Sequence, residues 1–380
     1  QAEDGIRDVE RSRGLGDVYK RQPLMKWIRE IGPGILIAAA FIGPGTVTLC
    51  TIAGVSYGFS LIWALVLSIF ATIFLQELSL RVGLVTKMNV AEVISKSIKS
   101  IYLNKFLIVL IISSILIGNA AYEAGNITGA SLGISGIINN DSISYIPFFI
   151  GIVAFVILFQ GNYKLIEKSL IFLVLTMSVS FLITAIITKP NLESLIEGMF
   201  IPSFDENSIL IVLGLIGTTV VPYNIFLHSS LVTEKWDSIK KLKTARIESF
   251  ISILLGGIVS LSIIVTAASV NTQDVKSVID LARGLEPLYG KFAIYFLGIG
   301  LFASGITSSI TAPLAAAYVA KSCFGWKDSM KSLKFRLVWM IVLIFGVVIS
   351  LIELNPIEII KFAQFSNSLL LPIIAIILLW

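Results

Sequence analysis

Charged side chains are scarce in this sequence. Asp, Glu, Lys and Arg make up 14% of the 380 residues, whereas hydrophobic residues make up 56%. Because soluble domains carry about 25% charged residues, this balance excludes an ordinary soluble protein and predicts one that crosses the membrane several times. The net charge is +5, but the basic residues fall in short loops between apolar runs. We interpret them as topology signals, which argues against nucleic-acid binding.

Cysteine is also rare. The two cysteines, Cys50 and Cys323, both lie inside apolar segments, where a thiol most often packs as a small hydrophobic group. The sequence therefore predicts neither a disulfide, nor a cysteine metal site, nor a redox function.

The first 24 residues differ from the rest of the chain, because they are polar and mixed in charge. Residues 13–22 resemble a translated sequencing-adapter remnant more than protein, and Met25 is a candidate start. We expect residues 1–24 to be a disordered or artefactual segment, followed by a first five-helix repeat over 25–190 and a second over 191–380.

Ten apolar runs follow that are long enough, or nearly so, to cross a hydrocarbon core of about 30 Å. Two of them, the first and the sixth, contain residues that interrupt helices. The runs are 33–57, 61–84, 103–135, 145–160, 168–188, 207–232, 250–270, 289–322, 335–353 and 361–380.

Loop charge predicts the orientation of these runs. The loops that follow the second, fourth, sixth and eighth runs are rich in Lys and Arg, whereas Asp141 and Glu193 lie in opposite loops. The positive-inside rule places the basic side, and the N-terminus, in the cytoplasm. We expect the membrane to be a prokaryotic plasma membrane. The two halves then have opposite topology. We predict an all-α membrane protein with the inverted-repeat plan of LeuT-type carriers.

The two interruptions are the centre of the prediction. Residues 40–46 contain Pro44 and Gly45, and residues 217–224 contain Pro222. Proline and glycine break helices and leave backbone groups unpaired, which membrane proteins tolerate only where these groups line a cavity or are buried in protein. Two such breaks in matching positions point to a transporter's binding site.

The side-chain oxygens near the breaks are neutral and hard, and no carboxylate or sulfur lies within either break. A bare dication would lose tens of kcal/mol of solvation against such ligands, so a bound metal should keep much of its water. Mg²⁺ is the ion that most resists dehydration. Any single hydroxyl here could equally be a packing residue. The oxygens belong to Thr46, Thr48, Thr218, Thr219, Tyr223 and Asn224.

Few ionisable residues lie within the runs, and such residues suggest function. Glu77 could pair with Arg81 four residues on, whereas Glu123 has no local partner; His228, the sole histidine, follows the second break by seven residues. His228 could relay protons, face a vestibule or simply bond a neighbouring helix. Our candidates for an ion or proton pathway are Gln76, Glu77, Glu123, Asn126, His228 and Gln364.

From about residue 30 onward the sequence resembles the Nramp family of divalent-metal transporters. Residues 61–86 are similar to that family's second helix, residues 285–290 and 301–311 to its eighth, and residues 222–229 keep most of its sixth-helix signature. The resemblance implies a ten-helix carrier rather than an enzyme.

The departures from the family fall on its metal site. The family's Asp-Pro-Gly-Asn signature binds metal through its Asp and Asn, and here these positions are Gly43 and Thr46. In the family's Met-Pro-His signature, Val221 replaces the methionine and Tyr223 replaces the histidine. In the third helix, the Asp and Glu that form the family's proton pathway correspond to Glu123 and Asn126, so one acid is kept in kind and the other is neutral. The resemblance assigns the metal site to Ala40, Gly43, Thr46, Thr218, Val221, Tyr223 and Asn224.

These departures resemble the Nramp-related magnesium transporters. We therefore expect alternating-access transport of Mg²⁺, and also of Mn²⁺, as a partly hydrated ion with weak or no proton coupling. We expect no cofactor, no nucleic acid and no obligate protein partner, with the metal ion and the lipid bilayer as the only partners. Two alternatives stay open: a LeuT-type carrier of an amino acid or similar solute held on the amides of Gly45 and Thr46, and a membrane sensor that does not transport.

Overall fold

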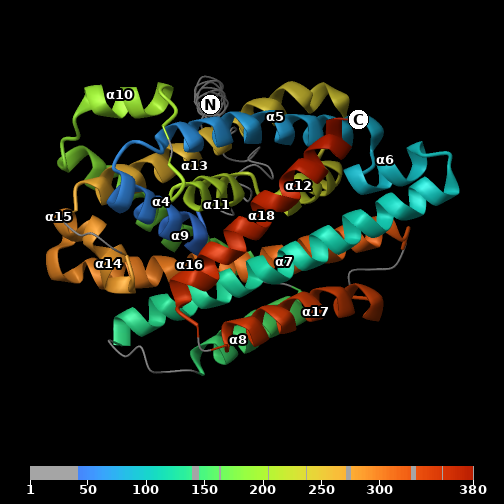
Figure 1. The fold of residues 1–380 in the computed structure, drawn as a ribbon. Helices are drawn as coiled ribbons and strands as arrows, with labels where there is room; N and C mark the ends of the chain where they lie inside the picture. The colour runs from blue at the N-terminus through green and yellow to red at the C-terminus, as the bar shows by residue number, and fades with distance from the viewer. Residues whose placement is uncertain are drawn as a thin grey trace, which may run out of the picture. The chain divides into compact units, whose positions relative to one another are not determined.

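Every regular element that the computed structural model describes is a helix (Figure 1). The described residues are 42–138, 145–161, 164–203, 205–236, 238–270, 275–326, 331–352 and 354–379. The long helices are α4 (Pro44–Tyr57), α5 (Ile62–Thr86), α7 (Ile101–Ile138), α8 (Ile146–Gln160), α9 (Lys164–Ile187), α11 (Ile209–Thr219), α12 (Pro222–Lys235), α13 (Leu242–Ala268), α16 (Ala293–Cys323), α17 (Leu333–Ser350) and α18 (Pro356–Leu379).

The ten predicted apolar runs each correspond to a helix, or to the helix pair α11–α12. Within the described residues, eight helical segments are long and apolar enough to cross a membrane. Helix α8 is shorter, with 15 residues, and the described part of the first run supplies the 14 residues of α4. The protein is therefore an all-helical integral membrane protein, as the apolar runs predict. Residues 33–41 of the first run, including Ala40, lie outside the described residues.

Short helices connect the long ones, and three of them begin at a side chain that caps the helix. Asn89 caps α6 (Val90–Ser97) and Asn191 caps α10 (Leu192–Phe200), in both cases by accepting hydrogen bonds from first-turn amides. Ser277 and Asp280 form a reciprocal capping box on α14 (Val278–Ala282), which runs on toward α15 (Glu286–Tyr289). Capping satisfies amides that have no intrahelical partner.

Large apolar side chains point outward from the helices. Phe70 is 66% exposed, Phe149 57% and Ile344 56%. Water would oppose such exposure, but hydrocarbon solvates these side chains, so exposed apolar surface is expected in a membrane protein. The buried interior instead holds many hydroxyl and amide side chains, the arrangement that helix association in lipid favours.

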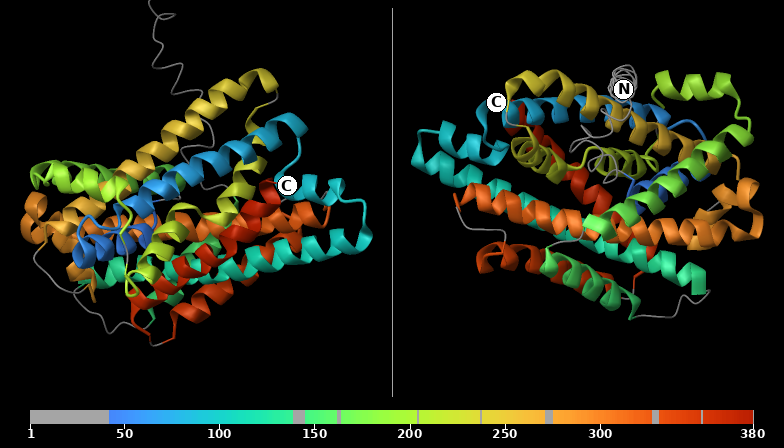
Figure 2. Two further views of the ribbon diagram at one scale, coloured as in Figure 1. Left: turned by 45° about the horizontal axis from the view of Figure 1, so that its top comes forward. Right: turned by 180° about the vertical axis from the view of Figure 1, so that it is seen from behind.

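The two halves of the chain interleave, and four helices of the first half pack on their counterparts in the second. Helix α7 lies along α16, α8 along α17, α5 along α13, and α4 against α11 (Figures 1 and 2). Two further contacts are also related by exchanging the halves: α7 packs on α18, and its counterpart α16 packs on α9. Contacts of this kind are what two inverted five-helix repeats produce.

The α7–α16 pair forms the axis of this arrangement, because small residues let the two backbones approach closely. A side-chain carbon at Gly133 would collide with the carbonyl oxygen of Gly298, and one at Gly298 would lie 2.6 Å from the carbonyl oxygen of Gly133. Glycine at both positions removes the obstacle. Helices α8 and α17 lie together on one side of this pair (Figure 1).

Candidate functional site

The second break is a two-residue gap between α11 and α12. Helix α11 ends at Thr219, Val220 and Val221 adopt non-helical backbone angles (φ −97°, ψ 77° and φ −80°, ψ 115°), and α12 begins at Pro222. Proline suits the first helical position because its missing N–H would have no partner there. The predicted interruption near Val221 is confirmed.

Only the part of the first break that begins at Ile42 lies within the described residues, and there the chain resembles the start of α12. Gly43 is extended (φ −87°, ψ 175°), Pro44 begins α4, and no side chain caps the helix. The N-terminus of α4 therefore presents backbone amides and the positive end of the helix dipole at the break. Gly45 lies one residue inside the helix.

The two breaks lie side by side. The Thr46 and Thr218 hydroxyl groups form a hydrogen bond of 2.8 Å across 172 residues of sequence, and both side chains are buried. Behind them, the Thr72 hydroxyl of α5 donates to the Thr219 carbonyl oxygen at 3.3 Å. The structure thus brings together threonines that the sequence places in separate halves of the chain.

Gln364 of α18 contacts both breaks. A side-chain carbon at Gly45 would overlap the side-chain amide of Gln364. One at Gly217 would overlap the backbone carbonyl oxygen of Gln364. The Gln364 side chain is 1% exposed, and its Oε1 atom has no hydrogen-bond partner. A buried amide oxygen without a donor is costly, so this oxygen is available to a cation or to a water molecule that a cation holds.

Asn224 supplies a second group of this kind. It is fully buried on the first turn of α12, and neither its Oδ1 nor its Nδ2 atom has a partner. The Tyr223 hydroxyl is likewise buried without a hydrogen-bond partner, and its ring meets the Tyr122 ring edge to face with centroids 5.5 Å apart. Val221, by contrast, packs into an apolar cluster. Val221 can therefore offer a bound ion only its backbone carbonyl.

The described residues contain no group of three or more His, Cys, Asp or Glu side chains that could hold a metal ion. The polar groups around the breaks are hydroxyls, amides and backbone, all of them uncharged. Such a site can neutralise little of a dication's charge, but it can accept and donate hydrogen bonds to the water around one.

Glu123 is a completely buried acidic residue on α7. Its side chain is 0% exposed; Asn126 Nδ2 donates to its Oε2 at 3.3 Å, and the Ser309 hydroxyl of α16 faces the same carboxyl group. Its Oε1 has no hydrogen-bond partner. Burial without a cation is unfavourable for a carboxylate, so the neighbouring hydrogen-bond donors matter for this group.

His228 and Gln76 form a separate buried pair. His228 Nδ1 and Gln76 Oε1 lie 2.8 Å apart between α12 and α5, and both side chains are at most 2% exposed. Because the amide oxygen accepts, the imidazole proton in this contact belongs to Nδ1. Of the roles that the sequence leaves open for His228, the structure supplies the bond to a neighbouring helix.

Glu77 lies in an ion pair rather than in the buried polar region. Its carboxylate binds Arg81 at 2.8 Å and Arg246 at 2.6 Å, and the side chain is 25% exposed. This geometry supports the ion-pair interpretation, and Glu77 connects α5 to α13.

Sequence reasoning missed two polar residues of the interior, Asn367 and Ser309. Asn367 lies one turn beyond Gln364 on α18, and its Nδ2 is buried without a partner. The signal was available, because 364, 367 and 368 are polar positions spaced three and four apart in an apolar helix, and so share one face. Ser309 contacts Glu123 across helices, which spacing along one helix cannot reveal.

A polytopic helical membrane protein whose two interrupted helices meet around buried polar groups has the architecture of a secondary transporter. The family model described as natural resistance-associated macrophage protein-like matches residues 34–380. The chain belongs to the Nramp family. This is a family of transporters, and the chain is not an enzyme.

Curated relatives share about a quarter of their residues with this chain. The divalent metal cation transporter MntH of Caldanaerobacter subterraneus is 28% identical over 321 residues, covering 81% of this chain and 75% of the relative. MntH of Staphylococcus saprophyticus is 28% identical over 90% of this chain and 81% of its own length. The metal transporter nramp1 homolog of Dictyostelium discoideum is 29% identical over 78% of this chain and 58% of its own length.

Solved structures support the same fold. A crystal structure of the Eremococcus coleocola manganese transporter matches with a TM-score of 0.76 and 19% identity, covering 94% of this chain and 80% of the other. Mhp1, a nucleobase-cation-symport-1 family transporter, matches with a TM-score of 0.59 and 18% identity over 91% of this chain and 77% of its own. The LeuT-type prediction is thereby confirmed.

Proposed function

We propose that this protein carries divalent metal ions, with Mg²⁺ as the preferred substrate and Mn²⁺ as a second one, across a prokaryotic plasma membrane by alternating access. Family membership and relatives named as divalent metal cation transporters support the substrate class. The residues at the breaks support the preference for Mg²⁺.

The observation that carries the proposal is the uncharged character of the joined breaks. Thr46, Thr218, Asn224 and Gln364 offer neutral oxygens, and the sequence has no methionine or cysteine within residues 40–46 or 217–224. Hard oxygens favour Mg²⁺, whereas a thioether supports selection of softer ions such as Mn²⁺. Neutral ligands replace a dication's water poorly, so the transported ion keeps part of its hydration shell.

Weak or absent proton coupling is the second part of the proposal. The contacts of Glu123 and His228 support it, because Glu123 bonds to the Asn126 amide and His228 to the Gln76 amide. A proton relay needs successive titratable groups within hydrogen-bond or single-water reach, and an amide does not titrate. Membrane potential, worth about 2.3 kcal/mol per charge per 100 mV, can drive the ion instead.

We also propose that the two repeats divide the chain at about residue 190, as 25–190 and 191–380. The pairing of α4 with α11, α5 with α13, α7 with α16 and α8 with α17 supports this division. Alternating access would then move one bundle against the other around the breaks.

Flux into proteoliposomes tests the proposed function. The purified full chain should take up Mg²⁺ with an inside-negative potential, and external Mn²⁺ should compete. Uptake of a zwitterionic amino acid without divalent flux would establish the solute-carrier alternative. Absence of both fluxes, in protein shown to be folded, would favour the sensor.

A further inference from the structure

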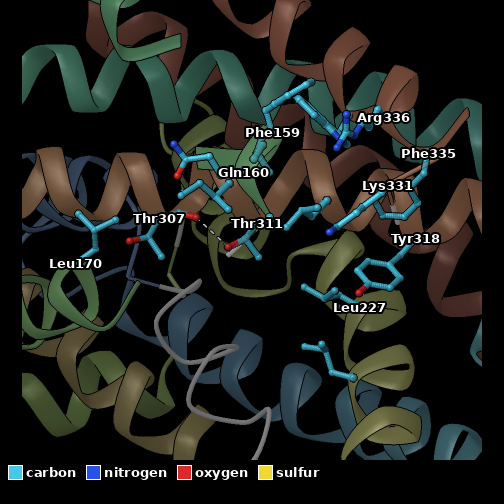
Figure 3. A pocket seen from close by; sticks show the side chains of 16 residues that line it. Phe159, Gln160, Leu170, Leu227, Thr307, Thr311, Tyr318, Lys331, Phe335 and Arg336 are labelled. Atoms are coloured by element: carbon cyan, nitrogen blue, oxygen red, sulfur yellow. Dashed lines mark hydrogen bonds between the residues drawn. The ribbon is translucent and has the colours of Figure 1, made fainter. Parts of the chain in front are cut away.

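A cavity lies between α8, α9, α12, α16 and α17 (Figure 3). Its volume is about 270 Å³. That is close to the lower end of the roughly 300–1,000 Å³ range of small-molecule sites. The walls are mainly apolar, and they include Leu158, Leu170, Leu231, Ile310, Leu314 and Trp339.

One side of this cavity is basic. Arg336 and Lys331 both line it, and no acidic side chain is among the described lining residues. Figure 3 shows the Lys331 side chain extending inward from the same side as Arg336 and Phe335. The guanidinium of Arg336 lies 4.3 Å above the centre of the Phe159 ring. Stacking on a ring uses the face of the guanidinium and leaves its edge N–H donors directed elsewhere.

The cavity therefore pairs an apolar interior with a cationic rim. The basic loops predict that this end of the helices faces the cytoplasm. Cytoplasmic leaflets carry anionic lipids, and basic pockets between membrane helices on that side bind their head groups. A free soluble anion would use the rim but leave the apolar walls unfilled.

We propose that this cavity binds an anionic phospholipid of the cytoplasmic leaflet. Its phosphate contacts Arg336 and Lys331, and part of one acyl chain lies against Leu158, Ile310 and Leu314. The lipid also touches Leu227 and Leu231 of α12, the half-helix that starts at the second break. A bound lipid thus ties α12 to the packed pair α8–α17.

Native mass spectrometry of the delipidated full chain tests this site. The protein is offered equal amounts of phosphatidylglycerol and phosphatidylcholine with identical chains, without divalent ions. We expect one tightly held phosphatidylglycerol, and Arg336→Gln should weaken its retention about fivefold, the effect of one basic residue near an anionic surface. Lys334→Gln is the matched control, because Lys334 is exposed on the same segment, carries the same charge and does not line the cavity.

A steric variant tests the apolar half independently. Leu314→Trp fills the cavity while both cations remain, so the tightly held lipid should be lost; Ile310→Trp is a second variant should the first not fold. Inorganic phosphate in millimolar excess should not displace the lipid, because it lacks the chain. Equal retention in wild type and Arg336→Gln, an equal loss in Lys334→Gln, or displacement by phosphate would overturn the proposal. Since no metal is present, these outcomes are separate from those of the transport assay.

Discussion

The hydroxyl groups of Thr46 and Thr218 lie 2.8 Å apart, and through them the two interrupted helices of the protein touch. Each residue belongs to a different half of the chain, so this contact joins the halves at the site itself. Both side chains are almost completely buried, at 2% and 1% exposure. Either hydroxyl can turn toward a hydrated ion, because a hydroxyl both donates and accepts.

Thr46→Val and Thr218→Val remove these hydroxyls with little change of shape. We expect each variant to raise the KM for Mg²⁺ about fivefold, the equivalent of one hydrogen bond of about 1 kcal/mol. Thr176→Val is the matched control, because the Thr176 hydroxyl donates to the Phe172 carbonyl oxygen within its own helix, α9. Initial rates of Mg²⁺ uptake measure the effect. An unchanged KM in both site variants would show that the two hydroxyls only pack.

Gly217→Ala tests the packing of the second break on α18. The added carbon would overlap the Gln364 carbonyl oxygen, and overpacking against backbone costs about 1–3 kcal/mol. We expect a lower Tm and reduced flux, measured by thermal unfolding and by uptake. Gly284→Ala is the control, since its nearest atom would lie at an ordinary 3.4 Å. If both variants have the Tm of the wild type, α11 and α18 do not pack closely at Gly217.

Restoring charged and soft ligands should change ion preference. Gly43→Asp with Val221→Met adds a carboxylate and a thioether at the joined breaks, and a thioether favours softer ions. We expect the ratio of Mn²⁺ to Mg²⁺ transport to rise at least about tenfold, measured by competition between the two ions in proteoliposomes. A ratio that stays constant would mean that these two positions do not face the ion.

Proton movement separates a uniporter from a coupled carrier. Mg²⁺ uptake driven by membrane potential should proceed without acidification of the vesicle lumen, since Glu123 and His228 each bond to an amide. A pH-sensitive dye trapped in the lumen measures this. Ion-dependent acidification that disappears in Glu123→Gln would show that the remaining acid suffices for coupling.

The architecture was predictable because apolar runs and helix breakers act locally. Pro44 and Pro222 mark the starts of α4 and α12, and within the described residues the apolar runs match the long helices to within a few residues, apart from earlier starts at α13 and α18. Glu77 was harder, because its bond to Arg81 is local but its second ion pair, with Arg246, comes from α13. No spacing rule predicts a partner on another helix.

The sequence could predict which residue types line the site, but not how they contact one another. A sequence shows that Thr46 and Thr218 are polar residues in apolar runs, but their 2.8 Å contact depends on how two halves pack. The same holds for Gln364, which reaches both breaks because Gly45 and Gly217 leave room for it. The cavity around Arg336 was not predicted at all, since five helices contribute its walls.

The most direct test of the central claim is a count of the water molecules on the bound ion. Mn²⁺, as a paramagnetic substitute for Mg²⁺, can be bound to the purified protein in exchangeable and deuterated water and examined by electron–nuclear double resonance. A neutral site should leave several of the six coordination positions, about three or more, occupied by water. A bound ion with no more than one water, coordinated directly by protein on every other side, would contradict the account.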